Sequence, residues 1–157
     1  MVDDSVNRRH VLAATGTALT VGLAGCSGGD DGDGNGDSDL DVPEEVQTWL
    51  DEESANNADS VEDFTGESGV TIINGEGGNF RFAPAVARIS TGTTVTWEWD
   101  SAGHSVTSEQ TPGESFDTGI QSGGHTFEQT FDTAGNVLYY CNPHRANGHV
   151  GALVVEE

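Results

Sequence analysis

Polar and apolar side chains alternate strictly in one short stretch of the chain, Thr94-Val95-Thr96-Trp97-Glu98-Trp99. A period of two is typical of a strand with one buried face. The same phase recurs in residues 125–131, and short apolar runs at 70–73, 87–90, 137–140 and 151–155 are separated by Gly-rich turns. About six to eight short strands over roughly 95 residues predict an all-β fold, a β-sandwich with one core.

A thiol and two imidazoles follow the predicted strand at 137–140, as Cys141, His144 and His149. Their Cys-x2-His-x4-His spacing lies in the loop before the strand that begins near Val150. Loops at one pole of a rigid scaffold are common places for binding sites. His104, which follows the strand at 94–99, is a further candidate from another loop.

One thiolate with two or three imidazoles suits copper, and a type-1 copper site adds a weak axial ligand, usually Met. The only Met in the chain is Met1, and His149 stands where an axial Met would be expected. The same donors also suit Zn²⁺. A Cys-His nucleophile pair is less favoured, because Cys and His three apart on one loop rarely align for proton transfer. No Gly-x-Ser-x-Gly motif is present in residues 70–157.

The first 26 residues are predicted to be a twin-arginine lipoprotein signal peptide. Arg8-Arg9 precedes a weakly apolar run at 11–24, and Leu23-Ala24-Gly25-Cys26 resembles a lipoprotein cleavage box. Such signals are receptor-read addresses and are excluded from the fold. The alternative is an uncleaved N-terminal anchor helix. Both predict an exported protein held at the extracellular face of the cell membrane, in the first case by a lipid on Cys26. Cys141 would then be the only thiol of the mature chain, which excludes an internal disulfide.

The net charge is −22, with five Arg, no Lys and 27 acidic residues. This charge excludes nucleic acid as a partner, because phosphate binding needs clustered Lys and Arg. Residues 27–63 hold 14 acids and no basic residue, and residues 64–157 hold 11 acids against three Arg. Such a balance fits a halophilic organism, because at 1 M salt the Debye length falls to about 3 Å and carboxylates repel one another less.

The chain divides into four parts. After the signal peptide, residues 27–42 form an Asp- and Gly-rich linker that we expect to be disordered. Residues 43–69 hold a short helix and an irregular lead-in, with Val46, Trp49 and Leu50 at helical spacing. Residues 70–157 form the β domain. Among the other His residues, His125 at a strand start is expected at the surface or a sheet edge.

The β domain resembles the plastocyanin-type cupredoxins, and among them the halocyanins of haloarchaea. The resemblance rests on the Gly-rich turn at 75–79 with the segment 80–84, the strand at 91–99, Gly103-His104, the segments 124–127 and 131–132, and the loop that begins at Tyr139-Tyr140-Cys141. The helix near Trp49 and the segment 65–67 also match what precedes the domain in halocyanins. The fold implied is a cupredoxin-like Greek-key β-sandwich.

The resemblance also implies roles for residues around one copper ion. His104, Cys141 and His144 would be the equatorial ligands. His144 and Pro143 would lie at the surface through which electrons pass, and Tyr140 would serve a second electron route. Ser105 and Asn142 would tie the two ligand loops together by hydrogen bonds, and the carbonyl of Gly103 would be a distant axial contact.

His149 departs from the family pattern, in which Met stands five residues after the His. Imidazole is a harder and stronger donor than a thioether. If it coordinates, we expect stabilised Cu(II), a lowered potential and a colour shifted from blue toward green or yellow. The alternative is that His149 turns to solvent.

Together these features predict a monomeric copper protein that carries single electrons between membrane redox proteins by Cu(II)/Cu(I) exchange. Four filled protein ligands would leave no open position, which argues against an enzyme. The alternatives are a copper or zinc binding module for storage, delivery or sensing, and a small copper enzyme if His149 is displaced.

Overall fold

The computed structural model describes residues 41–109 and 115–157. The predicted signal peptide, the lipidation site Cys26 and nearly all of the linker at 27–42 lie outside the described residues. No helix among the described residues is long and apolar enough to cross a membrane.

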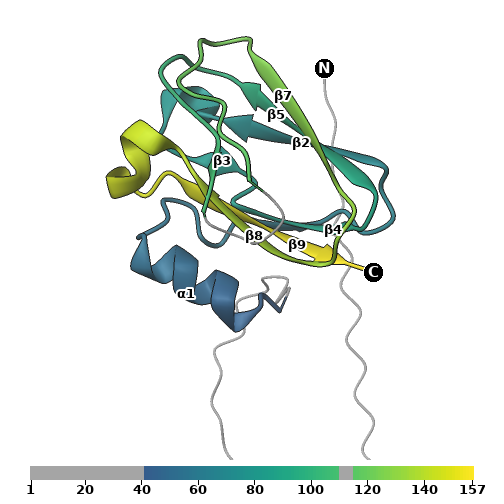
Figure 1. Cartoon of the computed structure of the whole chain (residues 1–157). Helices are drawn as coiled ribbons and strands as arrows, with labels where there is room; N and C mark the ends of the chain where they lie inside the picture. Colours follow the sequence, from purple (N-terminus) through teal and green to yellow (C-terminus); the bar gives the residue numbers. More distant parts are fainter. Residues whose placement is uncertain (1–40, 110–114) are drawn as a thin grey trace, which may run out of the picture. The chain divides into compact units, whose positions relative to one another are not determined.

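The described strands form two sheets that face each other (Figure 1). One sheet has the order β1-β4-β9-β8-β6 and the other β3-β2-β5-β7. The strands of the first sheet are β1 Val61–Asp63, β4 Val86–Ser90, β9 Val150–Glu156, β8 Gly135–Tyr140 and β6 Thr107–Ser108. The second sheet contains β3 Phe82–Ala83, β2 Gly69–Asn74, β5 Thr93–Trp99 and β7 Thr126–Phe131. The predicted all-β sandwich, preceded by a short helix, is confirmed.

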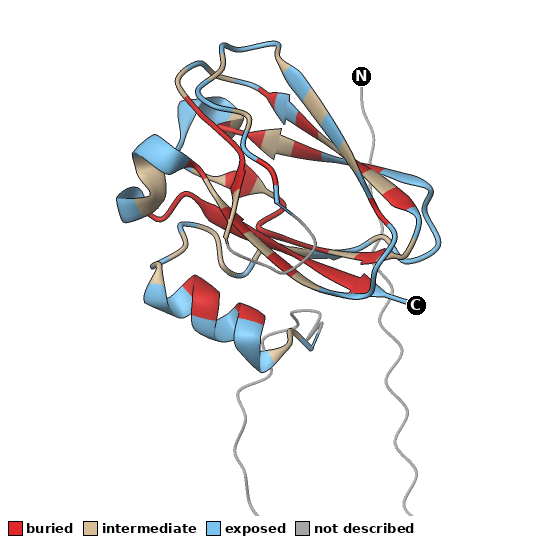
Figure 2. Cartoon of the chain, in the orientation of Figure 1, coloured by how far each residue is buried: buried red, intermediate tan, exposed pale blue. Residues whose placement is uncertain are grey.

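The strand β5 shows why this sequence forms a sandwich. Val95, Trp97 and Trp99 are buried between the sheets, whereas the side chains between them are partly or fully exposed. The red inner faces of both sheets are visible in Figure 2. Burying a large apolar side chain stabilises the fold by about 1.5–3 kcal/mol. The Trp97 ring packs edge-on against Tyr139 of the opposite sheet, with centroids 5.5 Å apart, so the two sheets share one core.

Helix α1, Glu44–Glu52, packs on the outer face of the first sheet (Figures 1 and 2). Its buried face consists of Val46, Trp49 and Leu50, the residues predicted from their spacing. They contact a second apolar cluster that includes Val150, Ala152 and Val154 of β9. The Nε1 atom of Trp49 donates a hydrogen bond to the carbonyl of Gly151 at 3.2 Å. Two acidic residues in the first turn favour the helix dipole.

The lead-in is more ordered than predicted, because residues 54–63 were expected to be irregular. Val61–Asp63 forms β1 and pairs in parallel with β4. Three residues are too few to show a periodic pattern, and their backbone bonding comes from the edge of β4. Two short helical segments of the 3₁₀ type complete the fold, η1 at Glu76–Gly78 and η2 at Asn142–Asn147.

Candidate metal centre

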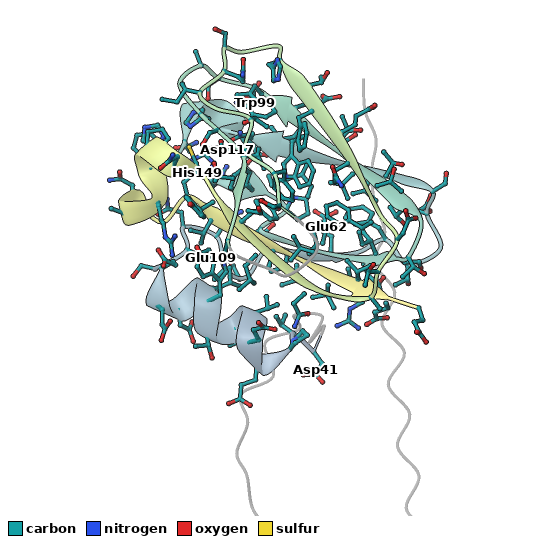
Figure 3. All side chains as sticks on the ribbon, in the orientation of Figure 1. Asp41, Glu62, Trp99, Glu109, Asp117 and His149 are labelled. Atoms are coloured by element: carbon teal, nitrogen blue, oxygen red, sulfur yellow. The ribbon has the colours of Figure 1, made fainter. Side chains whose placement is uncertain are left out.

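Four side chains that can bind a metal meet at one end of the sandwich, beside η2 (Figure 3). They are His104, Cys141, His144 and His149, and their donor atoms all lie within 4.8 Å of one another. Three come from the segment between β8 and β9, as the spacing predicted. The fourth, His104, lies between β5 and β6 and pairs with Gln121 through a β-bridge.

The conformation of the ligand loop, residues 141–149, is set by η2 and by Gly148. Cys141 directly follows β8 in extended backbone, and η2 carries His144. Gly148 then adopts a left-handed conformation with φ of 77°, which glycine adopts without steric cost. This turn brings His149 back beside the sheet, where the amide of Cys141 donates to the His149 carbonyl at 2.9 Å.

The separations among the donor atoms of His104, Cys141 and His144 match one shared ion. The Nδ1 atoms of His104 and His144 lie 3.1 Å apart. The Sγ atom of Cys141 lies 3.7 Å from Nδ1 of His104 and 3.4 Å from Nδ1 of His144. Metal–nitrogen distances of about 2.0 Å and metal–sulfur distances of about 2.3 Å in a four-coordinate site place donors roughly 3–3.8 Å apart.

His149 is fully buried, and neither ring nitrogen has a hydrogen-bond partner among the described residues. Its ring contacts Phe82, with centroids 4.4 Å apart, and lies 4.9 Å from the ring of His104. Burial and the two neighbouring imidazoles lower the pKa of His149 to about 3, against an opposing interaction with the backbone of Arg81 that is too poorly aligned to be a hydrogen bond. A buried imidazole without partners is costly. A bound metal ion would supply such a partner, and the donor set fits copper; coordination by His149 stays a prediction.

The other donors are also held in particular protonation states. Burial lowers the pKa of His104, and the nearby His144 lowers it further. Burial likewise lowers the pKa of His144. Burial raises the pKa of the Cys141 thiol, against the opposing effect of a hydrogen bond from the Ser105 amide. The imidazoles are thus neutral at pH 7, whereas the thiol must lose a proton to bind a metal.

Ser105 connects the two loops that supply the donors. Its amide donates to Sγ of Cys141 at 3.4 Å, and its Oγ accepts a hydrogen bond from the amide of Asn142 at 2.8 Å. Asn142 therefore takes part through its backbone. Such outer contacts fix the orientation of metal ligands. Gly103 precedes His104 with φ of 89°, and its amide donates to the carbonyl of Gln121 at 2.9 Å. An axial contact from its carbonyl stays a prediction.

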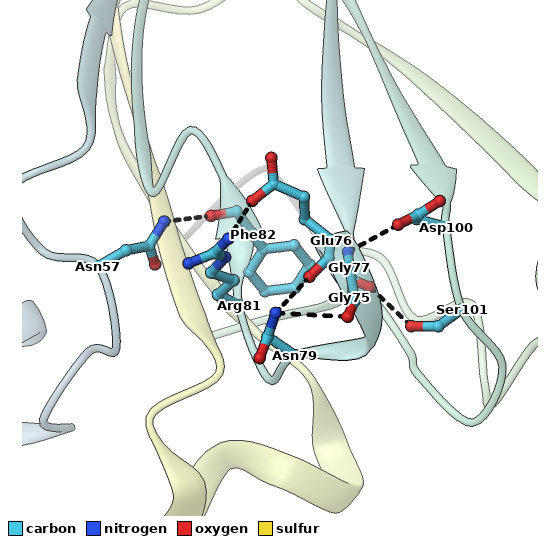
Figure 4. Close-up of polar contacts among 9 residues, drawn as sticks. All are labelled: Asn57, Gly75, Glu76, Gly77, Asn79, Arg81, Phe82, Asp100 and Ser101. Atoms are coloured by element: carbon cyan, nitrogen blue, oxygen red, sulfur yellow. Dashed lines mark hydrogen bonds and ion pairs between the residues drawn. The ribbon is translucent and has the colours of Figure 1, made fainter.

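Ser101 was not predicted, yet it orients His104. Its Oγ lies 3.1 Å from Nε2 of His104. The same hydroxyl donates to the carbonyl of Gly75 at 2.7 Å, a contact drawn in Figure 4. Because the Ser101 hydroxyl donates its proton to the carbonyl of Gly75, its oxygen accepts a hydrogen bond from Nε2–H of His104. The proton on Nε2 leaves Nδ1 of His104 unprotonated and facing Cys141 and His144. A Ser three residues before a His is too common a pattern to have signalled this role.

Phe80 was also missed, and it covers His144. The two rings stack with centroids 4.1 Å apart and an interplanar angle of 14°. Phe80 is 40% exposed. Pro143 and Ala146 are exposed in the ligand loop, on either side of His144. Tyr140 is half-buried beside Cys141. His125 lies outside the centre, edge-on to Trp99 at 4.9 Å, as its position in the sequence predicted.

A two-sheet sandwich with one thiol and three imidazoles at one end defines a mononuclear copper protein of the cupredoxin class. The profile of the copper-binding proteins of the plastocyanin/azurin family matches residues 70–156, and the chain belongs to this family. The chain is similar to a halocyanin from Natronomonas pharaonis, with 42% identity over 98% of this chain and 99% of that protein.

Two further similarities are more distant. A chloroplast plastocyanin from Tetradesmus obliquus is 30% identical over 54% of this chain and 64% of its own length. Among solved structures, a purple cupredoxin from Nitrosopumilus maritimus is 31% identical, with a TM-score of 0.48 over 55% of this chain and 99% of that chain.

Membership of this family confirms copper as the cofactor. Cupredoxins of the halocyanin and plastocyanin type are electron carriers, not enzymes, and this protein is one of them. The predicted resemblance is likewise confirmed.

Proposed function

We propose that the protein is a membrane-tethered carrier of single electrons, which uses one copper ion held by His104, Cys141, His144 and His149. The observation that carries this proposal is the convergence of these four donors within 4.8 Å at one end of a rigid sandwich. When bound there, copper supplies a Cu(II)/Cu(I) couple. Four protein donors leave no open position for a substrate.

The surroundings of the donors support rapid electron exchange. Ser105 and Ser101 hold Cys141 and His104 from outside the cluster, so their positions need not change with the charge of the ion. His144 is the half-buried donor, and Phe80 stacks on it at the surface. Pro143 and Ala146 extend this surface, where a redox partner would dock.

His149 is the fourth ligand in this proposal, in place of the usual Met. Its burial and its two unpartnered nitrogens support coordination rather than rotation toward solvent. A third imidazole favours Cu(II), which is the harder ion. We expect a lowered potential and a green or yellow colour rather than blue.

The proposed location rests on sequence features outside the described residues. Arg8-Arg9 and the cleavage box ending at Cys26 support export and lipidation at the outer face of the cell membrane. The acidic linker at 27–42 would serve as a tether for a monomer that meets membrane redox proteins. The net charge of −22 without Lys supports a halophilic source. Metabolic labelling with a lipid precursor tests this location: wild type should be labelled at the membrane, whereas Cys26→Ser should be unlabelled.

The function is tested by optical and EPR spectra and a redox titration of the copper-loaded protein in high salt, beside His149→Met and His125→Met. We expect reversible one-electron reduction in all three proteins. Wild type and His125→Met should share a strong second charge-transfer band, which His149→Met should lose. Identical spectra for all three proteins would show that His149 does not bind copper. Absence of a thiolate-to-copper band would overturn the carrier proposal itself.

A metal-binding module for storage, delivery or sensing is the second candidate. Its supporting observation is that three imidazoles and one thiolate also suit tetrahedral Zn²⁺. A redox-silent site, or a higher affinity for Zn²⁺ than for copper in direct competition, would favour this candidate over the carrier.

A further inference from the structure

Arg145 lies between two donors in the ligand loop but points away from the metal centre. Its Nε and Nη2 atoms donate to the two carboxylate oxygens of Glu53 at 3.0 and 2.8 Å. Its Nη1 atom donates to Glu109 at 2.6 Å. Glu53 follows helix α1 directly and is 92 residues away in the sequence. Bidentate pairs of this kind fix direction as well as distance.

Two aromatic rings hold the same guanidinium group. The Cζ atom of Arg145 lies 4.9 Å from the ring centroid of Trp49 in α1 and 4.4 Å from that of Tyr140 in β8. Trp49 is itself fixed by its hydrogen bond to Gly151. The side chain therefore has a defined position set by the helix, the strand and two carboxylates. An isolated surface ion pair has no such restraint.

A second set of contacts joins the lead-in to the far end of the ligand loop. The amide of Asn56 donates to the carbonyl of Gly148 at 3.1 Å. The side-chain Nδ2 of Asn56 donates to the carbonyls of Asn147 at 2.7 Å and Phe80 at 2.5 Å. A β-carbon on Gly148 would overlap the carbonyl oxygen of Ser54. Residues 53–56 thus contact the backbone directly before His149 and the segment that carries Phe80.

From these contacts we propose that the lead-in is a clamp on the ligand loop and that Arg145 is its positioning residue. The clamp fixes the separation of His144 and His149 and slows the loss of copper; this inference rests on the proposed function. The loop needs outside support because η2 is a short 3₁₀ segment, whose hydrogen bonds are poorly aligned. The lead-in residues of the clamp, 53–56, lie outside residues 70–156, the part that matches the family profile, whereas Arg145 lies within it.

The test compares full-length wild type with Arg145→Lys, Glu53→Gln and the double variant. Lys keeps the charge but cannot make the bidentate pair or stack as a plane. Arg88→Lys is the matched control. Arg88 also binds the chain that precedes helix α1, through the carbonyl of Asp41, and pairs with Glu156 at 3.5 Å, but neither partner touches the ligand loop.

Copper release into an excess of chelator should be about tenfold or more faster in Arg145→Lys and Glu53→Gln, the size typical for loss of an outer partner of a metal ligand. The double variant should be little faster than either single variant, because both remove one interaction. The EPR spectrum should broaden as His144 and His149 become less fixed. Arg88→Lys should release copper at the wild-type rate.

A second readout uses the copper-free protein. Hydrogen exchange at the amides of Asn56 and Cys141, which bond to Gly148 and His149, should accelerate in Arg145→Lys and not in Arg88→Lys. Wild-type release and exchange rates in Arg145→Lys would overturn the clamp. Equal effects of Arg145→Lys and Arg88→Lys would show that copper release follows the general stability of the protein, and this result would also overturn the clamp. Failure of wild type to bind copper would instead overturn the proposed function.

Discussion

The backbone of Gly75 lies directly against the imidazole ring of His104. A β-carbon built on Gly75 would stand 2.6 Å from Nε2 of that ring and would overlap Oγ of Ser101. Gly75 also has a left-handed φ of 75°. Glycine is therefore required at position 75 for two reasons: the backbone is left-handed, and the His104 ring occupies the space that a side chain would need. The Gly-rich turn thus packs against the side of the His104 ring that carries Nε2.

Gly75→Ala should displace His104 and weaken copper binding. The added methyl group cannot fit unless the ring or Ser101 moves, and Ser101 fixes the tautomer of His104. We expect at least about a tenfold loss of copper affinity, as for other changes in the contacts of a metal ligand. Competition with a chromophoric chelator measures the affinity, and the absorption spectrum reports the altered site.

Gly78→Ala is the control for this substitution. Gly78 has nearly the same φ, 76°, but a β-carbon there meets nothing within 4 Å. Both variants bear the strain of a left-handed residue, about 1–2 kcal/mol. Only Gly75→Ala should change the spectrum. If both variants bind copper alike, the contact with His104 does not control the site.

Ser105→Ala should destabilise the protein and disturb the site together. The substitution leaves the amide of Asn142 without its acceptor, at a cost of about 1–3 kcal/mol if that amide stays buried from water. The ligand loops also lose a direct connection, so the EPR lines should broaden. Urea denaturation of the copper-free protein measures the first effect.

Ser108→Ala provides a matched comparison on β6. Its Oγ accepts from the amide of Phe116 at 2.9 Å, which resembles the bond that Ser105 makes. The loss of stability should therefore be similar, while the copper spectrum stays that of wild type. A normal spectrum in Ser105→Ala as well would show that the loop connection has no effect on the metal.

The strands were predictable where alternation is long enough to be seen. The seven residues of β5 bury every second side chain, and the period of two is visible in the sequence. By contrast, β1 and β6 have three and two residues, and their bonding depends on β4 and β8. Their formation is a property of the partner strand rather than of their own side chains.

The candidate donors in the ligand loop were predictable because Cys141, His144 and His149 lie close in the sequence. His104 is more remote; its position after the strand at 94–99 made it a further candidate, and the resemblance to cupredoxins gave it the role of an equatorial ligand. The contacts that hold these donors were not predictable. Arg145 reaches Glu53 across 92 residues, and Gly75 meets His104 only after β2 and β5 pair. The spacing of residues within one segment of the sequence cannot predict such contacts.

Tyr139→Phe should maintain or increase stability, unlike most substitutions in a core. Tyr139 is fully buried, and its hydroxyl makes no well-aligned hydrogen bond among residues 41–109 and 115–157, although the Trp97 side chain is close enough to influence its pKa. A buried unsatisfied group costs about 1–3 kcal/mol, so we expect a gain of roughly 1 kcal/mol in the free energy of unfolding. Tyr140→Phe is the control, since its ring still lies under Arg145. A loss of more than about 1 kcal/mol in Tyr139→Phe would mean that the hydroxyl is bonded.

Copper binding should release about one proton near pH 7, and that proton comes from Cys141. Burial raises the pKa of this thiol, so it is protonated in the copper-free protein and must ionise to bind. The pKa values of His104, His144 and His149 are lowered, so these imidazoles are largely neutral at pH 7 and contribute little to the proton count. The apparent affinity should therefore rise about tenfold per pH unit between pH 7 and 8. Calorimetry in two buffers with different ionisation enthalpies measures the proton count. A count that approaches two at pH 8 would show that an imidazole is protonated in the free protein, contrary to these lowered pKa values.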